Sequence, residues 1–451
     1  MLIARYFSLL ATLACATAAP LIERTGLLPP SQDPWYQAPK DLDALAPGSI
    51  LKSRKPPAPI AAFGIESVNL QAAHQIMYKT TNSFNGSTAT VTTVLIPHNA
   101  DLTKVLSYQS IVDAASIDCA TSYALQLGSK SGVVFGTFTT QAELFLIAAL
   151  LDKGWVVVLP DYLGPHSAFL ANRLAAHAVL DGIRAVTKST AFTGVQHNAT
   201  VALWGYSGGS VATGWAAELH ASYAPELNIV GAALGGTVPS IPPVVKAVNK
   251  GYAAGLLPSG FLGLAAEYPE LKGIIHEQVV PQHRPAFEKV KKQCLVADLE
   301  EFFYEDIVSM LEEPSILTSG SLATILGEVA MGKSTPKMPL YVYKPVHDEI
   351  SPVANTDDLV EFYCANGGSV QYERDWVSLH GTLLATGAPK ALSWLISLVD
   401  GKPQPTGCST SNVFSSFLDL KALEIFPKAI LDDLWALLKE PIGPRRHWYS
   451  L

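Results

Sequence analysis

The sequence predicts an α/β fold in which a mostly parallel central sheet is interrupted by a helical cap insertion. Short apolar runs that end in turn residues alternate with segments of helical length, and this alternation stops between about residues 237 and 336, where helical patterns dominate. Strands that alternate with helices are typical of βαβ units, whose strands run parallel. We therefore expect a first core part with an N-terminal arm at 20–236, a cap at 237–336, and a second core part with a C-terminal segment at 337–451.

The first 19 residues predict a cleaved secretory signal peptide. One early cation, Arg5, precedes an apolar stretch at residues 9–16, and small residues lead up to Pro20. This order is typical of secretory signals, and the alternative is a short membrane anchor. No later apolar run reaches the roughly 20 residues of a membrane span, so we expect a secreted, extracellular protein.

The N-terminal part of the mature chain predicts an arm followed by a hairpin. Residues 20–59 are dense in proline, which favours an extended arm with few regular elements. Residues 66–80 and 88–97 then alternate apolar and polar side chains around Asn85-Gly86. This pattern is typical of an antiparallel hairpin, which we expect at the leading edge of the sheet.

The rest of the core is read from strand and helix patterns in order. Predicted strands cover residues 105–110, 155–159, 201–204, 229–234, 340–343 and 370–372. Predicted core helices cover residues 168–187, 210–223, 357–366 and 388–400, and predicted cap helices cover 242–256, 285–296 and 299–310. The first three of these strands are four to six residues long and rich in β-branched or aromatic residues.

Composition excludes some classes of function. The chain has 451 residues, of which 49% are hydrophobic and 16% charged, and its formal net charge is −8. It contains no block of lysines and arginines of the kind that binds phosphate backbones, so we expect no nucleic-acid partner. The usual metal-ligand spacings are also missing, so we expect neither a metal nor an organic cofactor.

Cysteines and glycosylation sequons fit an exported protein. Cys15 lies in the signal peptide, which leaves four cysteines in the mature chain: Cys119, Cys294, Cys364 and Cys408. An even number in an exported chain favours two disulfides; sequence alone permits three pairings, and four free buried thiols are the alternative. Asn85-Gly86-Ser87 and Asn198-Ala199-Thr200 match the N-glycosylation pattern.

The strongest chemical signal is Gly205-x-Ser207-x-Gly209, the one Gly-x-Ser-x-Gly run in the chain. It falls between a predicted strand and a predicted helix, where a nucleophile elbow must lie. The strained turn of an elbow leaves no room for flanking side chains and projects the serine hydroxyl above the sheet. The amide of Gly208 can then help to stabilise an oxyanion. The alternative is a glycine-rich turn with a capping serine.

A serine nucleophile needs a histidine base that is oriented by a carboxylate. In this kind of fold the acid and then the histidine follow the serine along the chain. His380 lies in a predicted short loop between a strand and a helix, and Asp348 lies just past the end of the strand at 340–343. We therefore expect His380 as the base and Asp348 as the acid, with Glu349 as the alternative acid and His347 as a bystander.

These motifs resemble those of the fungal secretory lipases similar to Candida antarctica lipase A, in the α/β-hydrolase superfamily. The resemblance rests on residues 205–209, on 107–113 leading to 118–123, on His347-Asp348 and on His380-Gly381, and it covers about residues 34–400. It implies an α/β-hydrolase fold with a helical cap. It also implies the triad Ser207, Asp348 and His380, an oxyanion hole of Asp113 and the Gly208 amide, and disulfides Cys119–Cys294 and Cys364–Cys408.

The predicted activity is hydrolysis of carboxylic esters through an acyl-enzyme. The resemblance implies acylglycerols and other esters as substrates, and some relatives deacetylate secondary metabolites such as trichothecenes. We therefore expect a monomer that acts on a small-molecule or lipid ester, with transient contact to a lipid interface. The alternatives are an esterase that deacetylates a secondary metabolite, a peptidase with the same triad, and a non-catalytic binding protein on a hydrolase scaffold.

Overall fold

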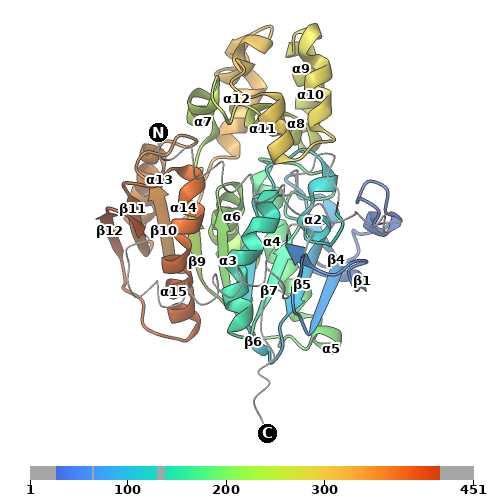
Figure 1. Ribbon diagram of the computed structural model, residues 1–451, viewed down its shortest axis with the longest axis vertical. Coiled ribbons are helices and arrows are strands. Elements are labelled where there is room, and N and C mark those ends of the chain that lie inside the picture. Colours follow the sequence, from blue (N-terminus) through green and yellow to red (C-terminus); the bar gives the residue numbers. More distant parts are fainter. Residues whose placement is uncertain (1–26, 63–65, 130–137, 417–451) are drawn as a thin grey trace.

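The structure is a computed structural model that describes residues 27–62, 66–129 and 138–416 (Figure 1). Its centre is a ten-stranded sheet. In spatial order the strands are β1 (Ile50–Arg54), β4 (Ala72–Thr81), β5 (Ser87–Ile96), β7 (Trp155–Pro160), β6 (Asp101–Gln109), β8 (Thr200–Tyr206), β9 (Ile229–Gly235), β10 (Leu340–Pro345), β11 (Val370–Asp375) and β12 (Cys408–Val413). From β7 to β12 all neighbours are parallel. The predicted α/β class is confirmed.

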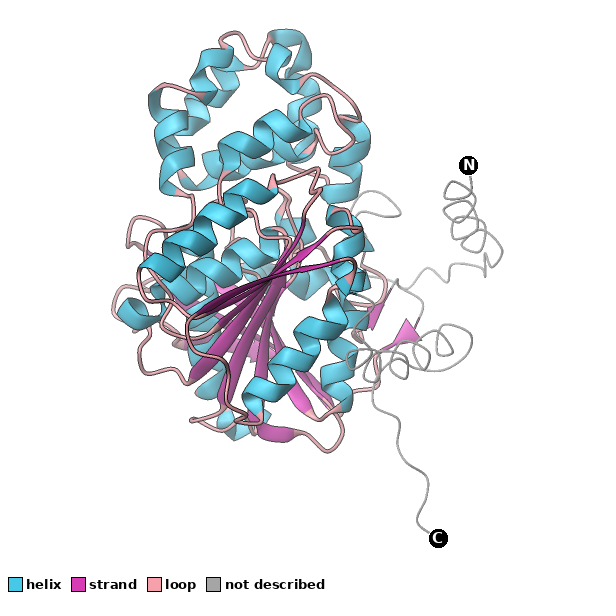
Figure 2. Ribbon diagram, turned by 90° about the vertical axis from the view of Figure 1, so that its left-hand side faces the viewer, coloured by secondary structure: helices cyan, strands magenta, loops and turns pink. Residues whose placement is uncertain are grey.

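Helices cover both faces of the twisted sheet (Figure 2). One face packs against α4 (Asn172–Thr187), α6 (Gly208–Tyr223) and α13 (Val353–Ala365), and the other against α3 (Phe138–Asp152), α14 (His380–Thr386) and α15 (Ala388–Val399). Strand β7 shows how this works. Val156 and Val158 belong to the first hydrophobic cluster, whereas Val157 and Leu159 belong to the second. A strand buried on both faces has a continuous run of apolar residues, which is why the sequence predicted this strand.

The predicted hairpin is confirmed, but its expected position at the edge is wrong. Strands β4 and β5 pair antiparallel from Ala72 opposite Ile96 to Thr81 opposite Ser87. Outside them lies β1, which pairs with β4 and forms the sheet edge within the arm that was expected to hold few regular elements. Two short strands, β2 (Ala61–Ala62) and β3 (Glu66–Ser67), pair separately. The core also contains two short helices, α2 (Thr121–Ala124) and α5 (Thr190–Thr193), and two 3-10 turns, η1 (Pro34–Tyr36) and η2 (Ile117–Cys119).

The cap leaves the sheet after β9, returns before β10, and lies above the edge at which the parallel strands end (Figure 1). It consists of α7 (Ile241–Val248), α8 (Leu256–Glu267), α9 (Pro269–Gln278), η3 (Pro281–His283), α10 (Arg284–Val290), α11 (Leu295–Glu301), η4 (Ile307–Met310), η5 (Pro314–Leu317) and α12 (Gly320–Glu328). None of the three predicted cap helices is continuous over its predicted range. The helix predicted at 242–256 ends at residue 248, and those predicted at 285–296 and 299–310 are each interrupted. Lys250, with φ 64°, is left-handed and separates α7 from α8.

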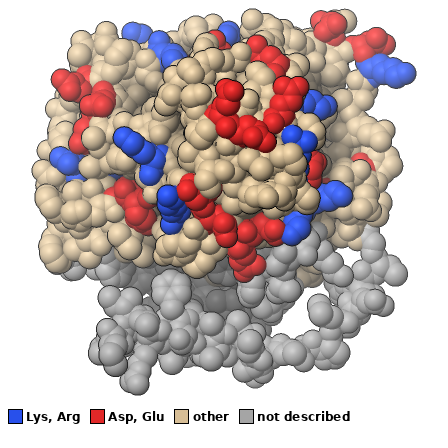
Figure 3. All heavy atoms as spheres, turned by 90° about the horizontal axis from the view of Figure 1, so that it is seen from above, with Lys and Arg blue, Asp and Glu red and all other residues tan. Residues whose placement is uncertain are grey.

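Seen from above, the cap carries a broad arc of acidic side chains, with lysines and arginines scattered around it (Figure 3). Among the described residues no single helix is long and apolar enough to cross a membrane; α14 and α15, bent by 48° at their junction, reach that length and composition only as a pair. The predicted signal peptide and residues 417–451 of the predicted C-terminal segment lie outside the described residues.

Two disulfides join distant parts of the chain, and they are the pairs that the family resemblance implies. Cys119–Cys294 ties the segment after β6 to the cap across 175 residues, and Cys364–Cys408 ties α13 to the edge strand β12 across 44 residues. Both sequon asparagines, Asn85 and Asn198, are exposed, so both are accessible to glycosylation.

We expect loss of Cys119–Cys294 to destabilise the protein more than loss of Cys364–Cys408. A cross-link stabilises mainly by restricting the unfolded chain, which gives about 5 kcal/mol for the longer loop and about 4 kcal/mol for the shorter one. Cys119 and Cys294 are also buried, whereas Cys408 is exposed. The double-alanine variants of each pair should be compared by chemical denaturation. A smaller loss for Cys119→Ala/Cys294→Ala would contradict this ranking.

Candidate active site

Ser207 lies at the turn between β8 and α6, near the middle of the sheet. Its backbone is strained, with φ 52° and ψ −124°. The flanking glycines are required by space: a Cβ on Gly205 would lie 2.4 Å from the carbonyl oxygen of Gly209, and a Cβ on Gly209 would lie 2.0 Å from that of Gln109. This is the geometry of a nucleophile elbow, with the hydroxyl held at the start of a helix.

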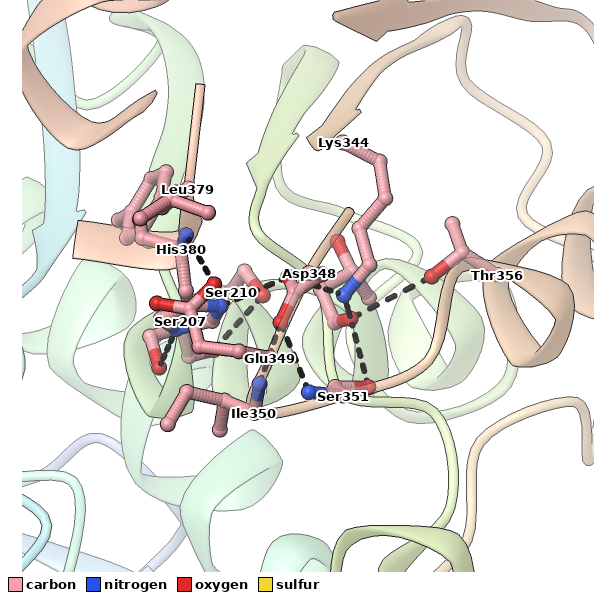
Figure 4. Close-up of polar contacts among 12 residues, drawn as sticks. Ser207, Ser210, Lys344, Asp348, Glu349, Ile350, Ser351, Thr356, Leu379 and His380 are labelled. Carbon is pink, nitrogen blue, oxygen red and sulfur yellow. Dashed lines mark hydrogen bonds and ion pairs between the residues drawn. The ribbon is translucent and has the colours of Figure 1, made fainter. Parts of the chain in front are cut away.

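His380 and Asp348 meet Ser207 at the edge where β8, β10 and β11 end (Figure 4). The Nε2 atom of His380 lies 2.8 Å from Ser207 Oγ, and its Nδ1 atom lies 2.8 Å from Asp348 Oδ2. All three residues are more than nine-tenths buried. His380 is the first residue of α14 rather than part of the loop that the sequence predicted. The structure therefore brings together the serine, histidine and aspartate that the sequence singled out.

The Asp348 carboxylate is held by hydrogen bonds on both oxygens. Its Oδ1 atom accepts from the backbone N–H groups of Ile350 and Ser351, at 2.9 and 2.8 Å. Its Oδ2 atom is shared between His380 and the ammonium of Lys344, which lies 2.8 Å away. Burial opposes ionisation of Asp348, but the charges and hydrogen bonds of His380 and Lys344 outweigh it and hold the pKa of this carboxyl well below its usual range.

Two neighbours of the triad residues have contacts that were not predicted: Lys344 had no expected role, and Glu349 was expected only as the alternative acid. Lys344 is fully buried on β10. The Glu349 carboxylate accepts the backbone N–H of His380 at 3.0 Å and the hydroxyl of Tyr252, a cap residue, at 2.7 Å. On the other side of the histidine, the Tyr206 hydroxyl donates to the His380 carbonyl at 2.6 Å. These contacts hold the backbone of His380 in place. The sequence signal that could have pointed to Lys344 is its position four residues before Asp348.

Asp113, the second oxyanion candidate, follows β6 and also lies beside Ser207. Its φ is 42°, and a Cβ on Gly208 would lie 1.9 Å from its Oδ1 atom, so the carboxyl sits directly over Gly208. Asp113 Oδ1 has no hydrogen-bond partner among the described residues. Burial raises the pKa of Asp113 to about 7, which means that much of this carboxyl is uncharged near neutral pH.

An apolar pocket of about 50 Å³ opens beside Ser207, Gly208 and Asp113. The core and the cap each contribute apolar walls: Tyr162, Leu163, Phe169, Leu170 and Val211 from the core, and Ile241, Val244, Leu256, Leu257 and Phe261 from the cap. Gly260 on α8 completes the cap side, where its missing side chain leaves space for Leu170. Ser207 thus faces a hydrophobic space rather than a polar one.

Comparison with known proteins gives one consistent family. A family model described as secretory lipase matches residues 127–407. The chain is 48% identical over 421 residues to "Lipase A" of Arthroderma benhamiae, covering 93% of this chain and 90% of that protein. It is 38% identical over 401 residues to "Lipase 5" of Candida albicans, covering 86% and 84%.

A solved structure agrees with the sequence relatives. Candida antarctica lipase A in its closed state superposes with a TM-score of 0.81 at 29% identity. The match covers 93% of this chain and 99% of that one. The predicted resemblance is therefore confirmed. The chain belongs to the secretory lipase family, adopts the α/β-hydrolase fold, and is a carboxylic ester hydrolase.

Proposed function

We propose that the protein is a secreted lipase or esterase that hydrolyses carboxylic esters through an acyl-enzyme on Ser207, with His380 as base and Asp348 as orienting acid. The observation that carries the proposal is the chain of 2.8 Å contacts from Ser207 Oγ through the His380 ring to Asp348 Oδ2, which opens onto an apolar pocket. A serine hydroxyl is a weak nucleophile at neutral pH, and this arrangement supplies the base that activates it.

Two acyl transfers complete the reaction. His380 removes the proton of Ser207, the serine oxygen attacks the ester carbonyl, and the imidazolium returns the proton to the leaving alcohol. Asp348 keeps the imidazole in the required tautomer and stabilises its charged form. Water, activated by the same histidine, then attacks the acyl-serine and releases the acid.

The backbone amides of Gly208 and Asp113 are the proposed oxyanion donors. Gly208 is the first residue of α6, where backbone N–H groups have no partner within the helix. Loss of one such donor costs roughly 10²–10³ in rate in other serine hydrolases. The Asp113 carboxyl lies beside this position, and its raised pKa favours the neutral form, which does not repel the developing negative charge.

The pocket indicates an apolar acyl group as the preferred substrate part. Its walls are aliphatic and aromatic on both the core and the cap sides. At about 50 Å³ the pocket has room for only a few water molecules, since one occupies roughly 10–15 Å³ on the same measure. A long acyl chain therefore requires α7 and α8 to move away from the core, which fits transient contact with a lipid interface.

A chain-length series of nitrophenyl esters, run beside an acetylated sesquiterpenoid, tests this substrate class. We expect kcat/KM to rise from acetyl to medium-chain esters, because each buried methylene contributes about 0.8 kcal/mol. Activity confined to acetyl esters would support the alternative, a deacetylase of secondary metabolites, and would overturn the lipase proposal.

Gly260→Leu should narrow the pocket and shift this preference. A Cβ at Gly260 already approaches Leu170 Cδ1 to 2.7 Å, so a leucine must occupy space beside Ser207 that the acyl chain would fill. We expect kcat/KM for medium-chain esters to fall at least tenfold relative to the acetyl ester. Gly273→Leu on α9 is the matched control, because a Cβ there meets nothing within 4 Å. Equal losses for both ester lengths would contradict the assignment of this pocket.

A further inference from the structure

The triad alone does not explain why Lys344 is buried beside Asp348. Its side chain is fully buried at the end of β10, and a lysine is almost never fully buried unless it is paired. Its ammonium lies 2.8 Å from Asp348 Oδ2, the same oxygen that lies 2.8 Å from His380 Nδ1 (Figure 4). A serine, histidine and aspartate relay works without such a cation, so the pairing calls for a function of its own.

The contacts of this side chain suit a charged ammonium. Besides Asp348, the ammonium donates to the carbonyl oxygen of Thr237 at 2.8 Å, so both of its described partners are acceptors. The Ser351 and Thr356 hydroxyls donate to the same carbonyl at 3.4 Å, which holds that acceptor in place. Burial lowers the pKa of Lys344 below its usual value, and the charge and hydrogen bond of Asp348 offset part of this shift.

We propose that Lys344 is a positioning residue that acts through Asp348 to disfavour protonation of His380 and so extends ester hydrolysis to more acidic pH. A protonated His380 would place a second positive charge on a carboxylate oxygen that already binds an ammonium. The two cations repel each other, and the carboxylate attracts each of them less. His380 then stays neutral, and able to act as a base, at a lower pH than in a triad without the lysine. The inference rests on the proposed function.

Other titratable or permanently charged groups face this cluster from the neighbouring elements. They are Glu349 in the same loop, Asp357 on α13 with its partner Arg374, Asp375 at the end of β11, and the hydroxyls of Tyr206, Tyr252, Tyr343 and Tyr372. Each of these interacts with the triad from further away or through the backbone. Lys344 differs from them because its charge touches the catalytic carboxylate directly.

The test measures kcat/KM against pH for wild type, Lys344→Met and Lys344→Gln with one soluble nitrophenyl ester. We expect the acid limb of the profile to move to higher pH by about one unit in both variants. A unit charge within about 4–6 Å of a titrating group shifts the pKa of that group by roughly 1–3 units. Lys344→Gln is informative because its amide can still donate to Asp348 and Thr237 while carrying no charge. It also serves where the methionine variant fails to fold.

Lys390→Met is the matched control. Lys390 on α15 pairs with the buried Glu373, which is not a triad residue, so the variant also removes an ammonium from a buried carboxylate. Its acid limb should coincide with that of wild type. Active-site titration with a fluorophosphonate normalises all rates to competent enzyme, so that poor folding does not enter the profile.

The outcomes distinguish a failure of this inference from a failure of the proposed function. An unchanged acid limb in both Lys344 variants, or the same displacement in Lys390→Met, overturns the proposal for Lys344 and leaves the proposed function standing. Wild-type protein that neither turns over esters nor reacts with the fluorophosphonate overturns the proposed function instead. A displacement seen with Met and Gln alike, and absent from the control, supports the charge of Lys344 as the cause.

Discussion

Ser207→Ala should abolish ester hydrolysis, with kcat reduced by roughly 10⁶-fold, the loss seen when the nucleophile of another serine hydrolase is removed. The hydroxyl of this residue lies 2.8 Å from His380 Nε2, and an alanine keeps the Cβ that the elbow already accommodates. The fold should therefore survive. The measurements are kcat on a nitrophenyl ester and covalent labelling with a fluorophosphonate, and both should be lost together.

Ser210→Ala is the matched control for this variant. Ser210 is buried three residues further along α6, and its hydroxyl donates to the Ser207 carbonyl at 2.7 Å rather than to His380. We expect it to keep labelling and activity within about tenfold, since a single neutral hydrogen bond contributes about 1 kcal/mol. Residual labelling of Ser207→Ala at the wild-type rate would show that another serine is the nucleophile and would overturn the proposed mechanism. It would also revive the reading of Ser207 as a capping serine.

The fold was predictable where burial leaves a pattern and unpredictable where it does not. Central strands such as β7 are covered on both faces and read as continuous apolar runs. The two edge strands were missed for the same reason, which is that little of each is buried. Strand β1 is only partly buried within a proline-rich segment, and β12, at Cys408–Val413, is almost entirely exposed, so neither displays the periodicity of a core strand.

The site was predictable through its chain order, because each residue follows the end of a parallel strand. The distances between the side chains could not be predicted from the sequence. Asp348 and Glu349 are adjacent in the chain, and only the structure shows that Asp348 meets the His380 ring whereas Glu349 meets the His380 backbone. Lys344 was missed because its burial arises from tertiary packing, and a lysine within a short strand resembles an edge residue in sequence.

Asp348→Asn should reduce kcat by about 10⁴-fold, the effect of the same change in a well-studied serine protease triad. Four N–H donors converge on this carboxylate: the amides of Ile350 and Ser351 on Oδ1, and Lys344 and His380 on Oδ2. An asparagine has one acceptor oxygen. Whichever way its amide points, an NH₂ group faces two donors, so either the loop opens or the imidazole loses its orientation.

Two further variants separate this loss from a loss of nearby charge. Asp357→Asn removes a partly exposed carboxylate on α13 that interacts with Lys344 but does not contact His380, and its kcat should stay within a few-fold of wild type. Glu349→Gln removes the charge from the alternative acid, whose oxygens accept from the His380 backbone and from Tyr252. We expect a loss well below that of Asp348→Asn, since the amide oxygen can still accept one of these hydrogen bonds. If Glu349→Gln proved the more damaging of the two, Glu349 rather than Asp348 would be the acid, and the electrostatic argument for Lys344 would lose its carboxylate.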